Sequence, residues 1–198
     1  IDKIKKLRKV IEEHNYQYYI LDAPTISDNE YDTLFKELEN LELKSPNLIT
    51  AESPTQRVGA KPLESFSTIK HRTPMLSLAN AMNLDDLIDF DNRIKKLLKT
   101  KNNIDYIAEP KLDGIGVELI YENGVFSEGC TRGDGIIGEN ITNNLKTIPS
   151  VPLRLRGSSF PSLLEVRGEV FITKEDFLIL NNNQNQNGMP KFANPRNA

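Results

Sequence analysis

Apolar residues recur at steps of three and four positions from residue 2 to about residue 20. Ile4, Leu7 and Ile11 follow this spacing, and His14 and Tyr18 continue it. This period is that of an amphipathic α-helix, which buries one stripe of its surface. The first stretch of the chain is therefore predicted to be helical.

A second helix is predicted directly afterwards, in the stretch "LDAPTISDNEYDTLFKELENLE". Ser27 and Glu30 fit a capping box, in which each side chain accepts a hydrogen bond from the other residue's backbone N–H. Ile26 can pack on Tyr31 as a hydrophobic staple at the same end. The apolar stripe behind this start consists of Tyr31, Leu34, Leu38 and Leu41. Together the two helices predict an N-terminal helical hairpin.

Proline and polar residues dominate from residue 44 to residue 74, as is typical of a linker. The later stretch "NLDDLIDFDNRIKKLLKT" predicts a third helix, for which Asn83 or Asp85 can supply the N-cap. Its apolar positions are Leu84, Leu87, Ile88, Ile94 and Leu98.

The period changes to two beyond residue 104, which indicates β-strands. Strands are predicted over residues 106–112, 116–121, 125–130 and 163–172. Asn123 and Gly124, between two of them, are typical of a type I′ hairpin turn. The Asn- and Gln-rich stretch 181–188 is predicted to be a polar loop. With helices first and antiparallel strands afterwards, the predicted fold class is α+β.

Composition narrows the classes of function. The 198 residues are 38% hydrophobic and 27% charged, as in an ordinary globular protein. The formal net charge of −3 excludes a broad basic field, so the chain alone is expected to bind DNA weakly or not at all. One cysteine, Cys130, excludes an internal disulfide and a Cys-rich zinc site. No long apolar run predicts a membrane span or a signal peptide, and the expected location is the cytoplasm.

Three charges alternate in the stretch "AEPKLDG": Glu109, Lys111 and Asp113. On a strand they would share one face, and a lysine in such a setting is a candidate nucleophile for attack on phosphorus. The lysine must first lose its proton, yet the two carboxylates alone favour the protonated amine. A nearby cation or a buried environment has to outweigh them. Mg²⁺ held by carboxylates is one such cation.

The hairpin turn also predicts which residues are neighbours in the sheet. With Asn123 and Gly124 as the turn, regular pairing puts Arg132 opposite Ile115, and hence on the same side as Lys111. Glycines at positions 114, 116, 133 and 135 could introduce a bulge into this pairing. A later strand places three charges on one face by the same alternation: Glu165, Arg167 and Glu169.

Simpler interpretations stay open for these residues. Alternating charges on a strand are most often its solvated face, and "KLDG" alone occurs by chance. The sequence "RGD" at residues 132–134 suggests an adhesion motif, although nothing else indicates secretion. Cys130 fits a small buried apolar residue. His14 and His71 fit structural roles, without a metal-spaced partner, and the hairpin tyrosines fit core packing.

Seven ordered blocks carry a resemblance to a known family. They are "DAPTISDNEYD", "SPTQRVG", "PMLSL", "EPKLDG", "TRGDG", "LEVRGEVF" and "FANPRNA". In this order and spacing they resemble bacterial NAD⁺-dependent DNA ligases, and the resemblance covers essentially the whole chain. It implies that Lys111 attacks the adenylyl phosphorus of NAD⁺, forming a lysine–AMP bond and releasing nicotinamide mononucleotide.

The resemblance also implies roles for other residues. Glu109 would contact the adenine amino group, and Asp113 would act beside the lysine. Arg132 and Glu169 would contact the nucleotide, Glu169 at the ribose or at Mg²⁺, while the pocket would be lined by Ser77 and Leu78. The nicotinamide mononucleotide half would be held by Tyr18, Tyr19, Asp28, Tyr31 and Asp32. Tyr19 stands where many relatives carry histidine, which is a departure from the family pattern.

The resemblance divides the chain into a helical NAD⁺-binding subdomain with its linker, residues 1–64, and a nucleotidyltransferase (adenylation) domain, residues 65–198. Family members continue beyond "NPRNA" with phosphate-contacting lysines, an oligonucleotide-binding fold, a zinc module, a helix-hairpin-helix region and a BRCT domain. The chain is therefore expected to be a monomeric fragment that uses NAD⁺ and Mg²⁺ but does not seal nicked DNA alone. Two alternatives stay open: an ATP- or GTP-dependent lysine nucleotidyltransferase, and a module that binds NAD⁺ without reacting.

Overall fold

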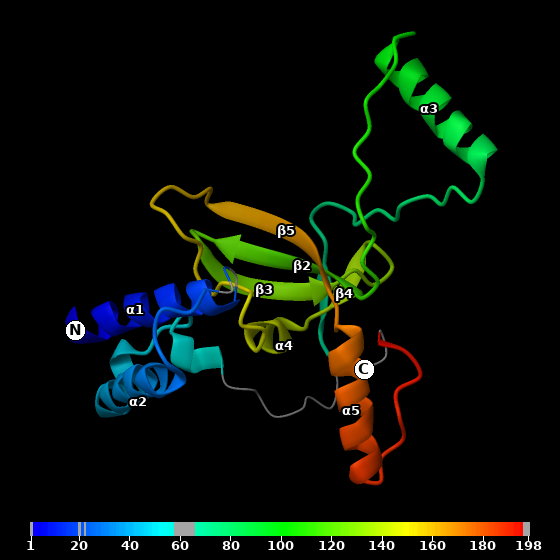
Figure 1. Cartoon of the computed structure of the whole chain (residues 1–198). Coiled ribbons are helices and arrows are strands. Elements are labelled where there is room, and N and C mark those ends of the chain that lie inside the picture. Colours follow the sequence, from blue (N-terminus) through cyan, green and yellow to red (C-terminus); the bar gives the residue numbers. More distant parts are fainter. Residues whose placement is uncertain (1, 20, 22, 58–65, 196–198) are drawn as a thin grey trace. The chain divides into compact units, whose positions relative to one another are not determined.

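A computed structural model describes residues 2–19, 21, 23–57 and 66–195 of the chain (Figure 1). Its elements in chain order are α1 (Asp2–Tyr19), α2 (Asp28–Lys44), the 3₁₀ turns η1 (Pro46–Leu48) and η2 (Pro54–Arg57), β1 (Thr68–Lys70), α3 (Leu84–Leu98), β2 (Ile115–Glu122), β3 (Val125–Thr131), β4 (Ile137–Glu139), α4 (Thr142–Lys146), β5 (Leu163–Val170) and α5 (Lys174–Gln186). Helices and antiparallel strands confirm the α+β class.

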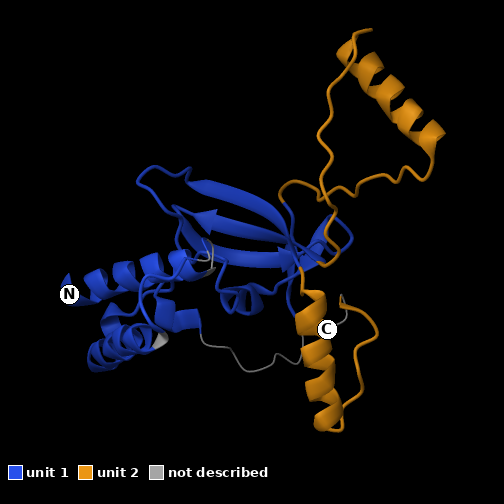
Figure 2. Cartoon of the chain, in the orientation of Figure 1, with its two compact units in different colours: residues 1–71, 115–170 blue, residues 72–114, 171–198 orange. Residues whose placement is uncertain are grey.

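The chain divides into two compact units (Figure 2). Unit 1 comprises residues 1–71 and 115–170, and unit 2 comprises residues 72–114 and 171–198. The predicted boundary between residues 64 and 65 lies outside the described residues. No helix in the described ranges is both long enough and apolar enough to cross a membrane.

The helical hairpin of unit 1 forms as the apolar spacing predicts. Ile4, Leu7 and Ile11 of α1 pack on Leu38 of α2, and all four are buried. Tyr18 is 52% exposed, so the buried stripe of α1 ends before it. The predicted capping box at the start of α2 is present, because Ser27 and Glu30 accept each other's backbone N–H.

A buried polar network, which the sequence did not indicate, closes the open end of the hairpin. The carboxylate of Glu42, on α2, accepts hydrogen bonds from Arg8 Nη2 at 2.5 Å and from Ser53 Oγ at 2.7 Å. Thr55 donates to the same carboxylate, and Arg8 also donates to the carbonyl of Leu48 at 2.7 Å. Burial acts to raise the pKa of Glu42, but the hydrogen bonds outweigh it and lower that pKa. The network therefore fixes η1 and η2 to the hairpin.

The sheet of unit 1 has the strand order β3-β2-β5, with antiparallel pairing throughout. One face carries the apolar core of Val117, Tyr121, Phe126, Leu145 and Leu153. Since successive side chains on a strand alternate between faces, the positions between the core residues of β2 point the other way. That second face carries the charged residues discussed below. β1 and β4 form a separate two-stranded sheet.

The β2–β3 hairpin has the predicted turn but not the predicted register. Asn123 and Gly124 both have positive φ, of 50° and 79°, as a type I′ turn requires. Pairing is regular only to Tyr121↔Phe126 and then shifts to Ile120↔Glu128, leaving Ser127 as the extra residue of a bulge. The bulge lies at Ser127, whose hydroxyl donates to the carbonyl of Ile120, and not at the glycines.

The prediction that Arg132 lies opposite Ile115 is therefore wrong. The backbone N–H of Arg132 donates instead to the carbonyl of Gly116, at 2.8 Å. A shift of one residue moves a side chain to the other face of the sheet, because the side-chain period is two.

Two further local predictions are wrong. Residues 106–112 form no strand: Pro110 has no N–H to donate to a ladder, and Ile107 is 90% exposed. The stretch 181–188 is not a loop, because α5 runs to Gln186. The N-cap of α5 is Thr173, whose hydroxyl accepts from the backbone N–H of Asp176.

In unit 2 the third predicted helix is confirmed as α3. Asn83 is its N-cap and accepts from the backbone N–H of Asp86 at 2.9 Å. The apolar positions of this helix are largely exposed, with Leu84 at 70% and Leu98 at 63%.

Candidate functional site

A cavity of about 260 Å³ lies in the helical hairpin of unit 1. We call it the hairpin cavity. It is lined by His14, Asn15, Tyr18, Pro24, Thr25, Ile26, Ser27, Tyr31 and Asp32. Tyr18, Tyr31 and Asp32 were predicted site residues, and the fold brings all three to this one cavity. The side chains of the other two predicted residues, Tyr19 and Asp28, lie outside the described part of the structure.

Local interactions hold the walls of the hairpin cavity. Tyr31 on α2 donates its hydroxyl hydrogen to Asn15 Oδ1 on α1, at 2.8 Å. The capping box fixes the loop that precedes α2, and hydrogen bonds from the N–H and hydroxyl of Ser27 lower the pKa of Glu30. The hydroxyl of Thr25 lies 3.4 Å from His14 Nδ1. The cavity is thus built by the same contacts that start the second helix.

The chemistry of this lining suits a cationic aromatic group. Tyrosine rings attract cations through their faces, and the carboxylate of Asp32 adds negative charge. His14, Asn15 and Thr25 line the cavity too, although they were not predicted as site residues. The signal for His14 was available: it lies four residues before Tyr18 on the same face of α1.

A second group of predicted residues meets on the charged face of the sheet. Gly116 of β2 pairs with Glu169 of β5 on one side and with Arg132 on the other. A Cβ built on Gly116 would lie 3.6 Å from both Arg132 Cβ and Glu169 Oε2. Arg132 and Glu169 therefore share this face, separated by a strip of backbone that has no side chain. Glu165 and Arg167 follow on the same face, as the alternation predicted.

The loop after Arg132 is a tight turn that needs its glycines. Gly133 has a φ of 54°, and a Cβ there would lie only 1.9 Å from the carbonyl oxygen of Ile137. Asp134 Oδ1 accepts from the backbone N–H groups of Ile136 and Ile137, both at 2.8 Å. These hydrogen bonds lower the pKa of Asp134. The carboxylate of the "RGD" sequence is thus used within its own turn, where it helps to position Arg132.

The predicted nucleophile belongs to unit 2. Glu109, Lys111 and Asp113 lie in a segment without helix or strand, and all three are exposed. Ser77 and Leu78 also belong to unit 2 and are exposed, Leu78 at 78%. Arg132 and Glu169, in contrast, belong to unit 1.

Comparison with known proteins covers nearly the whole chain. Residues 63–198 match the family described as the NAD-dependent DNA ligase adenylation domain. Residues 1–59 match the DNA ligase-like, N-terminal NAD+-binding domain. The hairpin cavity lies within the second match, and the "EPKLDG" and "TRGDG" blocks lie within the first.

Individual relatives give the same result. A DNA ligase of Geotalea daltonii is 54% identical over 198 residues, covering 99% of this chain and 30% of the relative. DNA ligases of Coprothermobacter proteolyticus and Thermotoga neapolitana are 52% and 51% identical, over 99% and 100% of this chain. The chain spans about 30% of the length of these curated relatives. The family is the NAD-dependent one rather than the ATP- or GTP-dependent alternative, and this chain belongs to the NAD-dependent DNA ligase family.

Proposed function

We propose that this chain carries out the first step of NAD⁺-dependent DNA ligation, the transfer of AMP from NAD⁺ to Lys111. In this step the Lys111 amine loses its proton and attacks the phosphorus of the adenylyl group. A nitrogen–phosphorus bond forms, the bond to the nicotinamide mononucleotide oxygen breaks, and nicotinamide mononucleotide leaves. The observation that carries the proposal is the hairpin cavity, which offers a tyrosine-lined, acidic site within the matched NAD⁺-binding region.

The hairpin cavity would hold the nicotinamide mononucleotide half. The nicotinamide ring is cationic and aromatic, so the rings of Tyr18 and Tyr31 suit stacking and the Asp32 carboxylate suits its charge. Tyr19 and Asp28 join this group through the family resemblance. A clamp for the nicotinamide half is what separates NAD⁺ from ATP as the donor of AMP.

The other predicted residues would hold the AMP half. Arg132 can contact the phosphate, because a guanidinium donates paired hydrogen bonds to phosphate oxygens. Gly116 leaves the backbone bare between Arg132 and Glu169, so a flat group can approach the sheet there. Contacts to the adenine and the pocket walls would come from Glu109, Ser77 and Leu78, with Asp113 beside the lysine.

The carboxylate of Glu169 also fits Mg²⁺, which prefers oxygen ligands. Bound Mg²⁺ would supply positive charge at the reacting phosphate. Positive charge near the Lys111 amine would favour the unprotonated, nucleophilic form that the attack on phosphorus requires. The cationic nicotinamide ring of NAD⁺ would add a second positive charge to that of Mg²⁺.

In the longer proteins that this chain resembles, AMP would pass from the lysine to the 5′-phosphate of a DNA nick. The 3′-hydroxyl would then attack that phosphate and release AMP. Nick sealing is proposed only for the longer proteins, because this chain spans about 30% of the length of its relatives. A DNA substrate also favours the cytoplasm as the site of action.

The proposal is tested by the intact mass of the chain after incubation with NAD⁺ and Mg²⁺, with ATP in place of NAD⁺ as the control. We expect the mass of one AMP to be added from NAD⁺ and none from ATP. An adduct formed from ATP would contradict the donor assignment. NAD⁺ binding without an adduct would favour the alternative of a module that binds NAD⁺ and does not react.

A further inference from the structure

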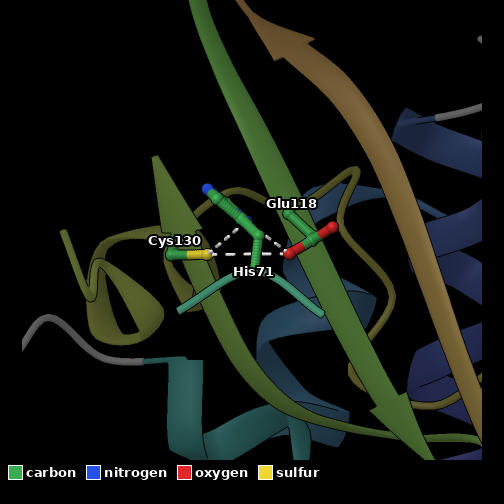
Figure 3. A group of neighbouring side chains, drawn as sticks. All are labelled: His71, Glu118 and Cys130. Atoms are coloured by element: carbon green, nitrogen blue, oxygen red, sulfur yellow. Dashed lines mark hydrogen bonds and ion pairs between the residues drawn. The ribbon is translucent and has the colours of Figure 1, made fainter. Parts of the chain in front are cut away.

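Three chemically different side chains meet on the charged face of the sheet in unit 1. His71 follows β1, Glu118 lies on β2 and Cys130 lies on β3 (Figure 3). Their side chains are buried, with relative exposures of 4%, 0% and 0%. The imidazole Nδ1 of His71 lies 2.7 Å from Glu118 Oε2 and 3.8 Å from Cys130 Sγ, and the sulfur lies 4.0 Å from the same carboxylate oxygen.

The surroundings fix the orientation of the His71 ring. Its Nε2 lies 3.1 Å from the carbonyl oxygen of Arg132, which can only accept a hydrogen bond. Nε2 is placed to donate to this carbonyl, which leaves Nδ1 directed at Glu118 Oε2, 2.7 Å away, and toward Cys130 Sγ. One nitrogen, one oxygen and one sulfur atom thus converge on the same point inside the fold.

We propose that His71, Glu118 and Cys130 form a binding site for a divalent metal ion of the zinc class. Imidazole nitrogen, carboxylate oxygen and thiolate sulfur are the ligands that zinc takes in proteins. With bonds of about 2.0–2.3 Å, a tetrahedral zinc ion separates its ligand atoms by roughly 3.3–3.7 Å. The two distances to sulfur are close to this range, and the distance between Nδ1 and Oε2 has to widen by roughly 0.6 Å.

The neighbours of the cluster act as outer partners of such a site. Metal-bound histidine usually donates its other N–H to a carbonyl or carboxylate, as His71 does to Arg132. The second oxygen of Glu118 lies 3.4 Å from Arg167 Nε, which orients the carboxylate. One thiolate and one carboxylate balance the charge of a divalent ion, and the positive charge of Arg167 beside Glu118 is partly exposed to solvent.

This site is independent of the proposed reaction. None of its three ligands is among the residues assigned to NAD⁺, and Arg132 takes part only through its backbone carbonyl. A chain that fails to transfer AMP would therefore not contradict the proposed metal site. A chain that fails to bind metal would likewise not contradict the proposed AMP transfer.

The test is a titration of the metal-free, reduced chain with Co²⁺, a spectroscopic substitute for zinc, followed by competition with Zn²⁺. We expect one ion per chain and a near-ultraviolet thiolate-to-cobalt absorption band, which Zn²⁺ abolishes. Cys130→Ser changes a single atom and should remove the band. His71→Ala should weaken binding by at least about tenfold. His14→Ala is the matched control for the metal ion alone, because His14 is the other of the two histidines and lies outside the cluster, and its Co²⁺ affinity should equal that of the unmodified chain.

Circular dichroism of each variant separates loss of binding from loss of fold. A folded Cys130→Ser chain that keeps the band would overturn the proposal, since the thiolate would then not be a ligand. The absence of saturable Co²⁺ and Zn²⁺ binding by the unmodified chain would also overturn it. An equal loss of Co²⁺ affinity in His14→Ala and His71→Ala would also contradict the proposal, because binding would then not depend specifically on His71.

Discussion

Tyr31 contributes to both the fold and the proposed site. Its ring packs against the hairpin core and stacks on Phe35 with centroids 6.1 Å apart. Its hydroxyl donates to Asn15, and the same side chain lines the hairpin cavity. The prediction of core packing and the prediction of a binding role were therefore compatible, because a tyrosine buries its ring and keeps its hydroxyl available.

Asp32 is the residue whose charge the NAD⁺ proposal needs most. We expect Asp32→Asn to weaken binding of nicotinamide mononucleotide by about tenfold, or about 1.4 kcal/mol, because it removes a negative charge from the hairpin cavity. Isothermal titration calorimetry measures the affinity. Glu39→Gln is the matched control, since it makes the same charge change on α2 outside the cavity. Equal affinities of Asp32→Asn and the unmodified chain for nicotinamide mononucleotide would show that the Asp32 carboxylate does not contribute to binding.

Cys130 should be an unreactive thiol in the metal-free protein. Burial first, and the charge of Glu118 second, raise the pKa of Cys130 to about 11. At pH 7 only roughly one thiol in ten thousand is then ionised, and the thiolate is the reactive form. We expect no labelling by a thiol reagent at neutral pH until the chain is unfolded in denaturant. Rapid labelling of the folded chain would show that Cys130 is accessible.

At the scale of elements, the start of α2 links stability to binding. Ser27→Ala removes the cap and should lower the free energy of unfolding by about 1 kcal/mol. It should also weaken NAD⁺ binding, because Ser27 is part of the hairpin cavity wall. Denaturant unfolding and calorimetry provide the two readings. Ser45→Ala is the control: Ser45 precedes η1 but makes no side-chain cap hydrogen bond. Equal effects of the two substitutions would contradict this role of the cap.

The Arg8–Glu42 network predicts how stability depends on pH. The pKa of Glu42 is lowered on folding, so its contribution is present above the unfolded value of about 4.5 and is lost as pH falls through the folded value. Glu42→Gln should therefore be less stable than the unmodified chain at pH 7, by about 3 kcal/mol, because Arg8 loses its buried partner. The difference should shrink as pH falls below 4.5. A difference that stays constant on acidification would contradict the network's role.

What the sequence could predict depended on how local each signal is. The helical hairpin, the caps at Ser27 and Asn83 and the turn at Asn123 follow from residues within a few positions of one another. Helix α5 was missed because its Asn-rich end is supported from a distance, where Asn181 exchanges hydrogen bonds with the backbone of Phe192. The strand expected at 106–112 failed because alternation alone supplies no hydrogen-bonding neighbour.

The candidate sites show the same division. Tyr18, Tyr31 and Asp32 could be grouped through helical spacing and the resemblance, and they do line one cavity. The position of Arg132 could not be predicted, because one extra residue at Ser127 shifts the ladder. The cluster at His71 unites residues 47 and 59 positions apart, a separation that no local pattern reports.

At the scale of the whole molecule, compact units are assembled from separate parts of the chain. Unit 1 joins residues 1–71 to 115–170, and the guanidinium of Arg57 helps to join them. It donates to the carbonyls of Ile148 at 3.0 Å and Val151 at 2.9 Å. The hairpin cavity and the Arg132–Glu169 face thus belong to one unit, while Lys111 belongs to the other. Both units contribute residues to the proposed reaction.

The most direct test of this account is the position of the AMP on the chain. After incubation with NAD⁺ and Mg²⁺, peptide mass mapping should find the added AMP on Lys111, and Lys111→Ala should bind NAD⁺ but gain no AMP. The acid-lability of a nitrogen–phosphorus bond gives a second signature of the same adduct. AMP attached at another residue, or an unchanged adduct in Lys111→Ala, would contradict the assignment of Lys111 as the nucleophile.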